Sequence, residues 1–154
     1  MNPLRSVVAV LGGVVVLSFM DRVLEGTLVS ALADAPPTDQ ASYLAVRNRP
    51  LVLAVTLVVH TMAAVLAGYI TGRIAGGQET RHAIGAGAVL MAAYLWAFLL
   101  DNPMLPPVWV RIVMLLVTVP ALVGGAIVRT QARSLRTEAD ARTEMSDVHT
   151  EEKS

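Results

Sequence analysis

The chain has 154 residues, of which 55% are hydrophobic and 16% charged, with a mean hydropathy of +0.59. Globular proteins hold about 45–50% apolar and ~25% charged residues, so this chain is too apolar for its size. Twelve basic and twelve acidic residues give zero net charge, which excludes a global positive field that would recruit nucleic acid. The absence of cysteine excludes disulfides, thiolate nucleophiles, iron–sulfur clusters and cysteine-ligated zinc. The composition therefore predicts a small all-α membrane protein.

Four stretches approach the ~20 apolar residues that a helix needs to cross a hydrocarbon core about 30 Å thick. They cover residues 6–28, 50–72, 82–101 and 105–129. A cleaved signal peptide is the competing interpretation of the first stretch, but three charges would separate its apolar core from the cleavage site. We expect a domain of residues 1–130 with four transmembrane helices in an antiparallel bundle.

The loop between the first two spans, residues 34–49, contains a proline pair and a candidate short helix. Thr38 is a suitable N-cap for that helix, with Asp39 in its first turn, and an irregular loop is the equal alternative. Trp96 and Trp109 fall near the outer ends of spans three and four, where amphipathic rings settle at the level of the lipid headgroups. We interpret both tryptophans as interfacial anchors.

Arginine is distributed unevenly between the two sides of this topology, and cytoplasmic loops normally carry the excess. With the N-terminus inside, the inner segments hold six arginines and the outer loops two. We therefore expect both termini in the cytoplasm. The inner arginines are Arg5, Arg73, Arg81, Arg129, Arg133 and Arg136, and the outer ones are Arg47 and Arg49.

Small residues recur at a spacing of four in the second span, at Ala64, Gly68, Gly72 and Gly76. This spacing places them on one stripe of a helix, where a neighbouring backbone can approach closely. The stripe serves either the internal bundle or a dimer contact. Candidate partner positions are Gly12, Gly13, Ala88, Ala92, Gly124 and Gly125.

Ionisable residues within the spans are the place to look for chemistry, because they are costly to bury and normally face the bundle interior. At a rise of about 1.5 Å per residue, Asp21 lies ~24 Å from Arg5 along the first helix and Arg111 only ~9 Å into the fourth. These depths are similar, so we expect an Asp21–Arg111 ion pair. Glu25 and Asp101 are competing partners nearer water.

His60 lies about 15 Å in from Pro50, near the membrane midplane. One hypothesis is a proton-relay or ligand-binding cavity, open to the outside, formed by Asp21, Glu25, His60, Tyr94 and Arg111. The simpler hypothesis is that the same groups make buried polar contacts that fix the order of the helices.

Other chemistries have no matching pattern. A bis-histidine haem needs two histidines facing at one depth, but His82 lies at the inner edge of span three and His149 in the tail. No phosphate-binding glycine loop, nucleophile elbow or HExxH motif occurs. We expect neither a cofactor nor a metal, and the sequence leans away from an enzyme.

Residues 131–154 differ in composition from the rest of the chain. They hold four basic and six acidic residues, against eight basic and six acidic in residues 1–130. Arg129, Arg133 and Arg136 share a helical face just below the membrane, which suits anionic headgroups. We expect a charged cytoplasmic tail, largely disordered beyond about Arg142.

Short motifs surround the second, third and fourth spans: the run AGYITGRIA from Ala67 to Ala75, then RHAI from Arg81, then PA from Pro120 with a later glycine pair. They resemble a group of small uncharacterised bacterial four-helix membrane proteins, in which a similar hairpin joins spans two and three and an acidic residue follows the first apolar run, as Asp21 does here. The resemblance covers most of residues 6–130. It implies a four-helix fold in a bacterial inner membrane, and it carries no functional residues with it.

The sequence thus favours a non-enzymatic structural or accessory subunit of a membrane assembly, in contact with the lipid bilayer and with other membrane proteins as a homo- or hetero-oligomer. The alternative is a small transporter or channel with a polar cavity around Asp21, His60 and Arg111.

Overall fold

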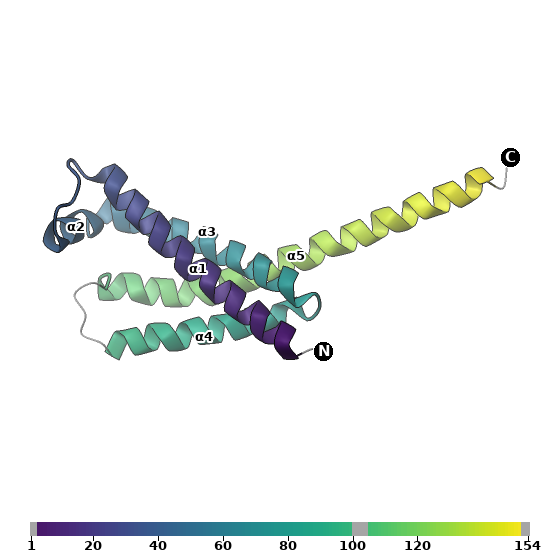
Figure 1. Cartoon of the computed structure of the whole chain (residues 1–154), viewed down its shortest axis with the longest axis horizontal. Coiled ribbons are helices and arrows are strands. Elements are labelled where there is room, and N and C mark those ends of the chain that lie inside the picture. Colours follow the sequence, from purple (N-terminus) through teal and green to yellow (C-terminus); the bar gives the residue numbers. More distant parts are fainter. Residues whose placement is uncertain (1–2, 100–104, 152–154) are drawn as a thin grey trace.

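The computed structural model describes residues 3–99 and 105–151, and this part of the chain is helical, with no strand. Four of its five helices are long and apolar enough to span a membrane, in agreement with the four spans expected from the sequence. The helices are α1 (Pro3–Leu32), α2 (Gln40–Arg47), α3 (Pro50–Ala75), α4 (Glu79–Leu99) and α5 (Val108–Glu151) (Figure 1).

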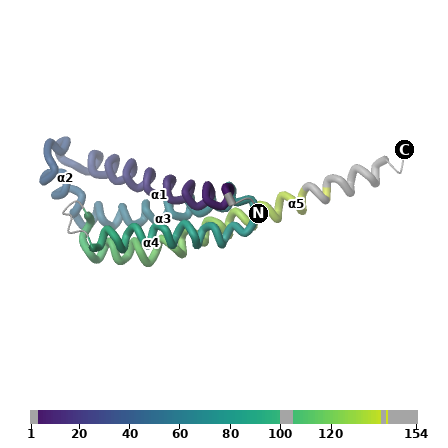
Figure 2. The backbone as a smooth tube through the Cα atoms, turned by 60° about the horizontal axis from the view of Figure 1, so that its bottom comes forward, coloured from purple at the N-terminus to yellow at the C-terminus, as the bar shows by residue number. Residues whose placement is uncertain are grey.

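The third helix is the centre of the bundle, because α3 contacts each of the other four helices. α4 also packs on α5, and α1 packs on α3 and α4 (Figure 2). α1 approaches α4 closely near the beginning of both helices, where a Cβ on Gly85 would lie 3.4 Å from Val10. It then diverges from α4 towards α2 (Figure 1). We call the end that holds α2 and the start of α5 the α2 end, and the opposite end the Gly76 end.

The Gly76 end is closed by a tight turn between α3 and α4. Gly76 has φ +64°, a left-handed conformation that ends the helix and that glycine adopts without steric cost. Arg5 Nε donates to the carbonyl of Ile74 at 2.7 Å, and Arg133 Nη1 donates to that of Gly76 at 3.2 Å. Cationic side chains from α1 and α5 therefore satisfy carbonyls that the end of α3 leaves unpaired.

Glycines bring the backbones of α3 and α5 into direct contact. A Cβ on Gly68 would collide with the backbone of Leu122, and one on Gly125 with that of Val65. A Cβ on Gly72 would lie 3.3 Å from the Glu79 side chain and 3.4 Å from that of Arg129. Ala64 is fully buried. The small-residue stripe thus serves the internal bundle, and Gly76 contributes both through its turn and through close contact with the Arg5 guanidinium of α1.

The other expected partner positions behave differently from one another. On α1, Gly13 packs against Thr71 on a second face of α3, and Gly12 faces Ile74. A Cβ on Gly124 would have nothing within 4 Å, and Ala88 and Ala92 are exposed. The Gly12–Gly13 pair of α1 therefore packs on α3, whereas only the second glycine of the α5 pair does.

The short helix α2 forms with a different cap from the expected one. Asp39, and not Thr38, is the N-cap: its carboxylate accepts from the Ser42 backbone N–H at 2.7 Å, and the Ser42 hydroxyl faces the Asp39 N–H at 3.3 Å. This reciprocal arrangement is a capping box, and the Ser42 N–H lowers the pKa of Asp39. The helix buries Val46 and Arg47 against the bundle.

The C-terminal segment also differs from expectation, because α5 continues as one helix to Glu151 (Figure 1). The disordered tail expected beyond Arg142 is therefore absent from the described part of the chain. Glu138 and Arg142 are four residues apart with the acid first, a spacing that supports an exposed helix.

Large apolar side chains are exposed on each of the four long helices. Phe19, Met62, Leu95 and Leu116 are examples, with 54–67% of their surface accessible. An apolar surface on every long helix fits a multi-pass membrane protein, in which lipid covers what water would not.

Candidate functional site

His60 on α3 connects three helices through its two ring nitrogens. Nδ1 lies 2.9 and 3.0 Å from the two carboxylate oxygens of Asp21 on α1. Nε2 lies 2.9 Å from the hydroxyl of Thr118 on α5, which in turn lies 2.6 Å from the carbonyl of Met114. The imidazole is 1% exposed, so both nitrogens have protein partners in place of water.

The hydrogen-bond donors and acceptors of this group require a proton between the His60 ring and the Asp21 carboxylate. The Thr118 hydroxyl has one hydrogen, which it gives either to Met114 or to His60. In the first case Nε2 donates to Thr118, and Nδ1 and the carboxylate hold one further proton between them. In the second case Nδ1 itself carries the hydrogen and donates to Asp21. Either arrangement satisfies every polar atom of the group.

The order hydroxyl, imidazole, carboxylate is also that of a nucleophilic catalytic triad. Here the hydroxyl cannot act as a nucleophile, because Thr118 is fully buried and no substrate reaches its oxygen. The arrangement can hold and relay a proton, and it ties α1, α3 and α5 together at one level.

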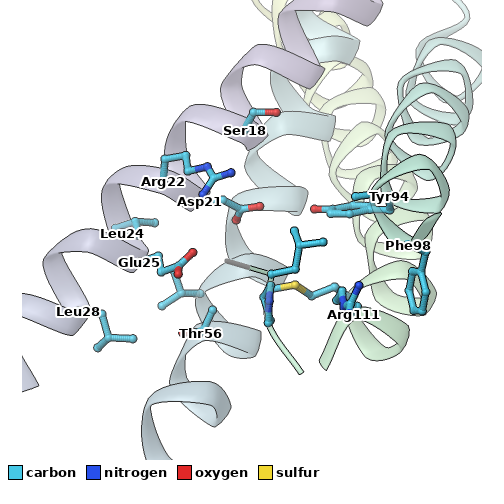
Figure 3. A pocket seen from close by; sticks show the side chains of 15 residues that line it. Ser18, Asp21, Arg22, Leu24, Glu25, Leu28, Thr56, Tyr94, Phe98 and Arg111 are labelled. Atoms are coloured by element: carbon cyan, nitrogen blue, oxygen red, sulfur yellow. The ribbon is translucent and has the colours of Figure 1, made fainter. Parts of the chain in front are cut away.

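A cavity of about 210 Å³ opens beside this group at the α2 end (Figure 3). Four of the five residues proposed from the sequence line it, and the fifth, His60, contacts it through Asp21 and Tyr94. The Tyr94 ring lies edge-on to the imidazole, with 6.3 Å between centroids and 71° between planes. The four lining residues are Asp21, Glu25, Tyr94 and Arg111.

The ion pair expected between Asp21 and Arg111 is not formed, because the Asp21 carboxylate is hydrogen-bonded to His60 instead. A depth counted from the sequence assumes that the helices are parallel. It gave the wrong partner for Asp21 because α1 is inclined to its neighbours (Figure 1). Asp21 lies level with Thr118, which is seven residues, or roughly 10 Å, beyond Arg111 on α5. Arg111 instead places its guanidinium over the Phe98 ring, 4.7 Å from the centroid.

Glu25 has partners that the sequence did not indicate. It accepts from the Tyr43 hydroxyl at 3.3 Å and lies 3.7 Å from Arg47 Nη1, and both of these come from α2. Arg47 is 3% exposed and also donates to the carbonyl of Leu105 at 3.0 Å. Partial burial and the nearby Glu25 carboxylate raise the pKa of Tyr43. Asp101, the other expected competitor for Arg111, lies outside the described residues.

Sequence reasoning missed Thr118 and Arg47 for different reasons. Thr118 lies two turns after Arg111 on one face of α5, and this spacing is a signal that could have been followed. Arg47 resembled an ordinary loop charge, and nothing in its neighbours indicated that α2 would fold back over the bundle and bury it.

The remaining polar groups lie at the Gly76 end. Arg133 pairs with Glu79 at 3.3 Å, so one of the three arginines expected to face headgroups is engaged within the protein. His82 lies 2.9 Å from the Gln78 carbonyl, far from His60 along the bundle. Over residues 3–99 and 105–151, no three His, Asp or Glu side chains gather into a group that could hold a metal.

Comparison with known proteins adds no relative: no family model, no curated protein and no solved structure matches the chain. The function of the protein is therefore inferred from the cavity and from the bundle around it. The cavity offers a buried proton-holding group, one aromatic hydroxyl and an arginine stacked on a ring, and the bundle offers a tightly packed support.

Proposed function

We propose that this protein is a non-enzymatic structural or accessory subunit of a membrane assembly. It crosses a bacterial inner membrane four times as an antiparallel bundle, with both termini in the cytoplasm. In this role the His60 group fixes the order and depth of α1, α3 and α5, and the exposed helix faces contact lipid and neighbouring subunits in a homo- or hetero-oligomer.

The observation that carries this proposal is the closed core below His60. A cluster of buried residues fills the bundle between the cavity and the Gly76 end, and the α3 and α5 backbones touch within it. A core packed in this way resists rearrangement, which favours a static role over transport. The cluster consists of Leu17, Ala63, Ala64, Ala67, Leu90, Ala121 and Leu122.

The distribution of arginine supports the proposed orientation. At the α2 end, Arg47 and Arg49 are paired with Glu25 and Asp34. At the Gly76 end, Arg73 and Arg81 are exposed and form no ion pair within the described residues. Arg129 and Arg136 are the proposed contacts to anionic headgroups on that side, and Trp96 and Trp109 the proposed anchors on the other.

Orientation is testable because the chain contains no cysteine, so an introduced one is the only thiol. We expect Ala45→Cys to react with a membrane-impermeant maleimide in cells with a permeabilised outer membrane. Ser134→Cys should react only after the inner membrane is opened. The reverse pattern would contradict the proposed topology.

The accessory role is tested by the size of the species in its native membrane. After solubilisation in mild detergent, native electrophoresis followed by mass spectrometry should place the chain in an assembly of defined stoichiometry. A chain that migrates only as a 16.3 kDa monomer in its detergent micelle would refute the proposal.

A small transporter or channel is the second candidate, and the cavity at the α2 end that reaches the His60–Asp21 pair favours it. The test is proton flux into liposomes that contain the protein. The accessory role predicts the same flux as empty liposomes. Flux that Asp21→Asn abolishes, with the melting temperature unchanged, would instead establish the transporter.

A further inference from the structure

Two arginines at the cavity have no acidic partner among the residues that the structure describes. Arg111 Nε is buried without a hydrogen-bond partner, and its guanidinium lies over the face of Phe98. Arg22, exposed on α1, lines the same cavity and forms no ion pair with a described residue (Figure 3). A guanidinium held on an aromatic ring is oriented and partly desolvated, which strengthens its attraction for an anion.

The two carboxylates of the cavity are already engaged. Asp21 shares a proton with His60, and Glu25 faces Arg47 and accepts from Tyr43. The charge of Glu25 is thus compensated by Arg47, and Asp21 adds at most one negative charge, against the two positive charges of Arg22 and Arg111. The cavity therefore has an excess of positive charge, although the whole chain is neutral.

Apart from Ser18, Thr56 and Tyr94, the rest of the lining is apolar, and it comes largely from the four long helices. Leu28, Val59, Ala97 and Met114 are among the lining residues. The cavity lies where α1 diverges from α4, and its edges on α1, at Ser18 and Arg22, are exposed (Figures 1 and 3). It is therefore open from the side between these helices, which is the direction of the lipid.

The depth of Arg111 matches that of a headgroup. It lies three residues, or roughly 5 Å, from the beginning of α5. The neighbouring Trp109 is 52% exposed, as expected for an aromatic ring at the membrane surface. At about 210 Å³ the cavity is smaller than the roughly 300–1,000 Å³ of pockets that enclose a whole drug-sized ligand. It has room for a head group and the first part of a chain.

We propose that this cavity binds the anionic head of an amphiphile, a phosphate or carboxylate, through Arg111 and Arg22, while the apolar chain leaves between α1 and α4. The Arg111 fork offers two parallel hydrogen bonds to such a head, and Phe98 holds the fork in place. This binding site goes beyond the accessory role and does not depend on it, since a static subunit and a transporter can both carry one.

The test is binding to the full-length protein in a non-ionic detergent, followed by intrinsic tryptophan fluorescence and melting temperature. Dodecyl phosphate is the probe, dodecanol carries the same chain without charge, and inorganic phosphate carries the charge without the chain. We expect dodecyl phosphate to bind saturably and to raise the melting temperature. It should bind at least tenfold more tightly than either control.

Each control separates one part of the proposal. Dodecanol that binds as tightly as dodecyl phosphate would refute an anion site. Inorganic phosphate that binds as tightly would show that the anion comes from solution and would refute the amphiphile. No saturable binding of dodecyl phosphate would refute the site altogether, and this outcome needs no variant that must fold.

Variants then assign the residue. Arg111→Gln should weaken dodecyl phosphate binding about tenfold or more, the size expected for loss of a charge-assisted hydrogen bond. Arg73→Gln, an exposed arginine at the Gly76 end, is the matched control and should leave the affinity unchanged. Equal affinities of the two variants would refute the role of Arg111. Asp101→Asn should change the affinity less than twofold, and a tenfold gain would show that Asp101 already occupies Arg111 and that the cation is not available.

Discussion

Replacing Gly125 by alanine should force α3 and α5 apart, whereas the same change at Gly124 should not. The two glycines are adjacent on α5 and differ in what a Cβ would meet. At Gly125 it would collide with the Val65 carbonyl oxygen and lie 2.8 Å from the Tyr69 nitrogen. At Gly124 there is nothing within 4 Å. One position therefore tests helix packing and the other serves as its control.

The cost follows from the movement that the new methyl group requires. Ordinary contacts begin at 3.4 Å and the Tyr69 nitrogen would lie at 2.8 Å, so the backbones must separate by at least 0.6 Å, and by more to clear the Val65 carbonyl oxygen. A gap of about 0.5–1 Å forfeits roughly a quarter to a half of the dispersion energy of the contacts it opens. Overpacking of this kind costs about 1–3 kcal/mol. The gain in helix propensity, up to about 1 kcal/mol, is common to both positions and cancels in their comparison.

The assay is reversible unfolding of each variant in mixed micelles, with helicity followed by circular dichroism. We expect Gly125→Ala to be less stable than Gly124→Ala by about 1–3 kcal/mol, and its melting temperature to be lower by about 2–4 °C for each kcal/mol. Equal stability of the two variants, within about 0.5 kcal/mol, would refute the backbone contact. It would also remove the closed core on which the accessory role depends.

Three further expectations concern the cavity and its cover. Thr118→Val should cost about 1–2 kcal/mol by leaving Nε2 of the buried His60 ring without a partner. Thr61→Val, whose hydroxyl bonds only within its own helix, should change the same unfolding free energy by less than about 0.5 kcal/mol. Arg47→Gln should cost about 2 kcal/mol because it leaves the partly buried Glu25 carboxylate without its cation, whereas Arg49→Gln, at an exposed pair, should have a much smaller effect. The pKa of Asp39 in the folded protein is lowered from 3.8, so the stability that its carboxylate gives to α2 is present above pH 3.8 and lost as the pH falls below that value. Amide NMR of α2 should show this loss. Asp39→Asn should abolish the pH dependence of the α2 signals.

The His60 group is compatible with both candidate functions, and its surroundings decide between them. A proton between His60 and Asp21 is hydrogen-bonded on both sides while the two side chains stay in place, and the Thr118 hydroxyl is the partner of the other ring nitrogen. For transport, the same proton would need a second exit towards the Gly76 end. The buried cluster around Leu17 and Leu122 stands in that direction, so such an exit requires α3 and α5 to separate.

Hydrophobicity and length were sufficient to predict the four long helices, because a membrane span is a local property of about twenty consecutive residues. The spacing of Ala64, Gly68 and Gly72 likewise predicted a close helix contact, since residues four apart share a face whatever the partner is. The members of the polar group, Asp21, His60, Tyr94 and Arg111, were predicted for a similar reason: an ionisable or polar side chain within a span has to face inward.

Only the tertiary structure decided which of these groups touch. Helix inclination, which no local pattern encodes, placed Asp21 level with His60 and Thr118 and left Arg111 on Phe98. The fold of α2 over the bundle buried Arg47 beside Glu25, a contact between segments far apart in the chain. Depth along a helix is additive and can be counted from the sequence. The pairing of charges depends on the angles between helices, and the angle of α1 depends on packing such as that of Gly13 against Thr71, about two turns before Asp21.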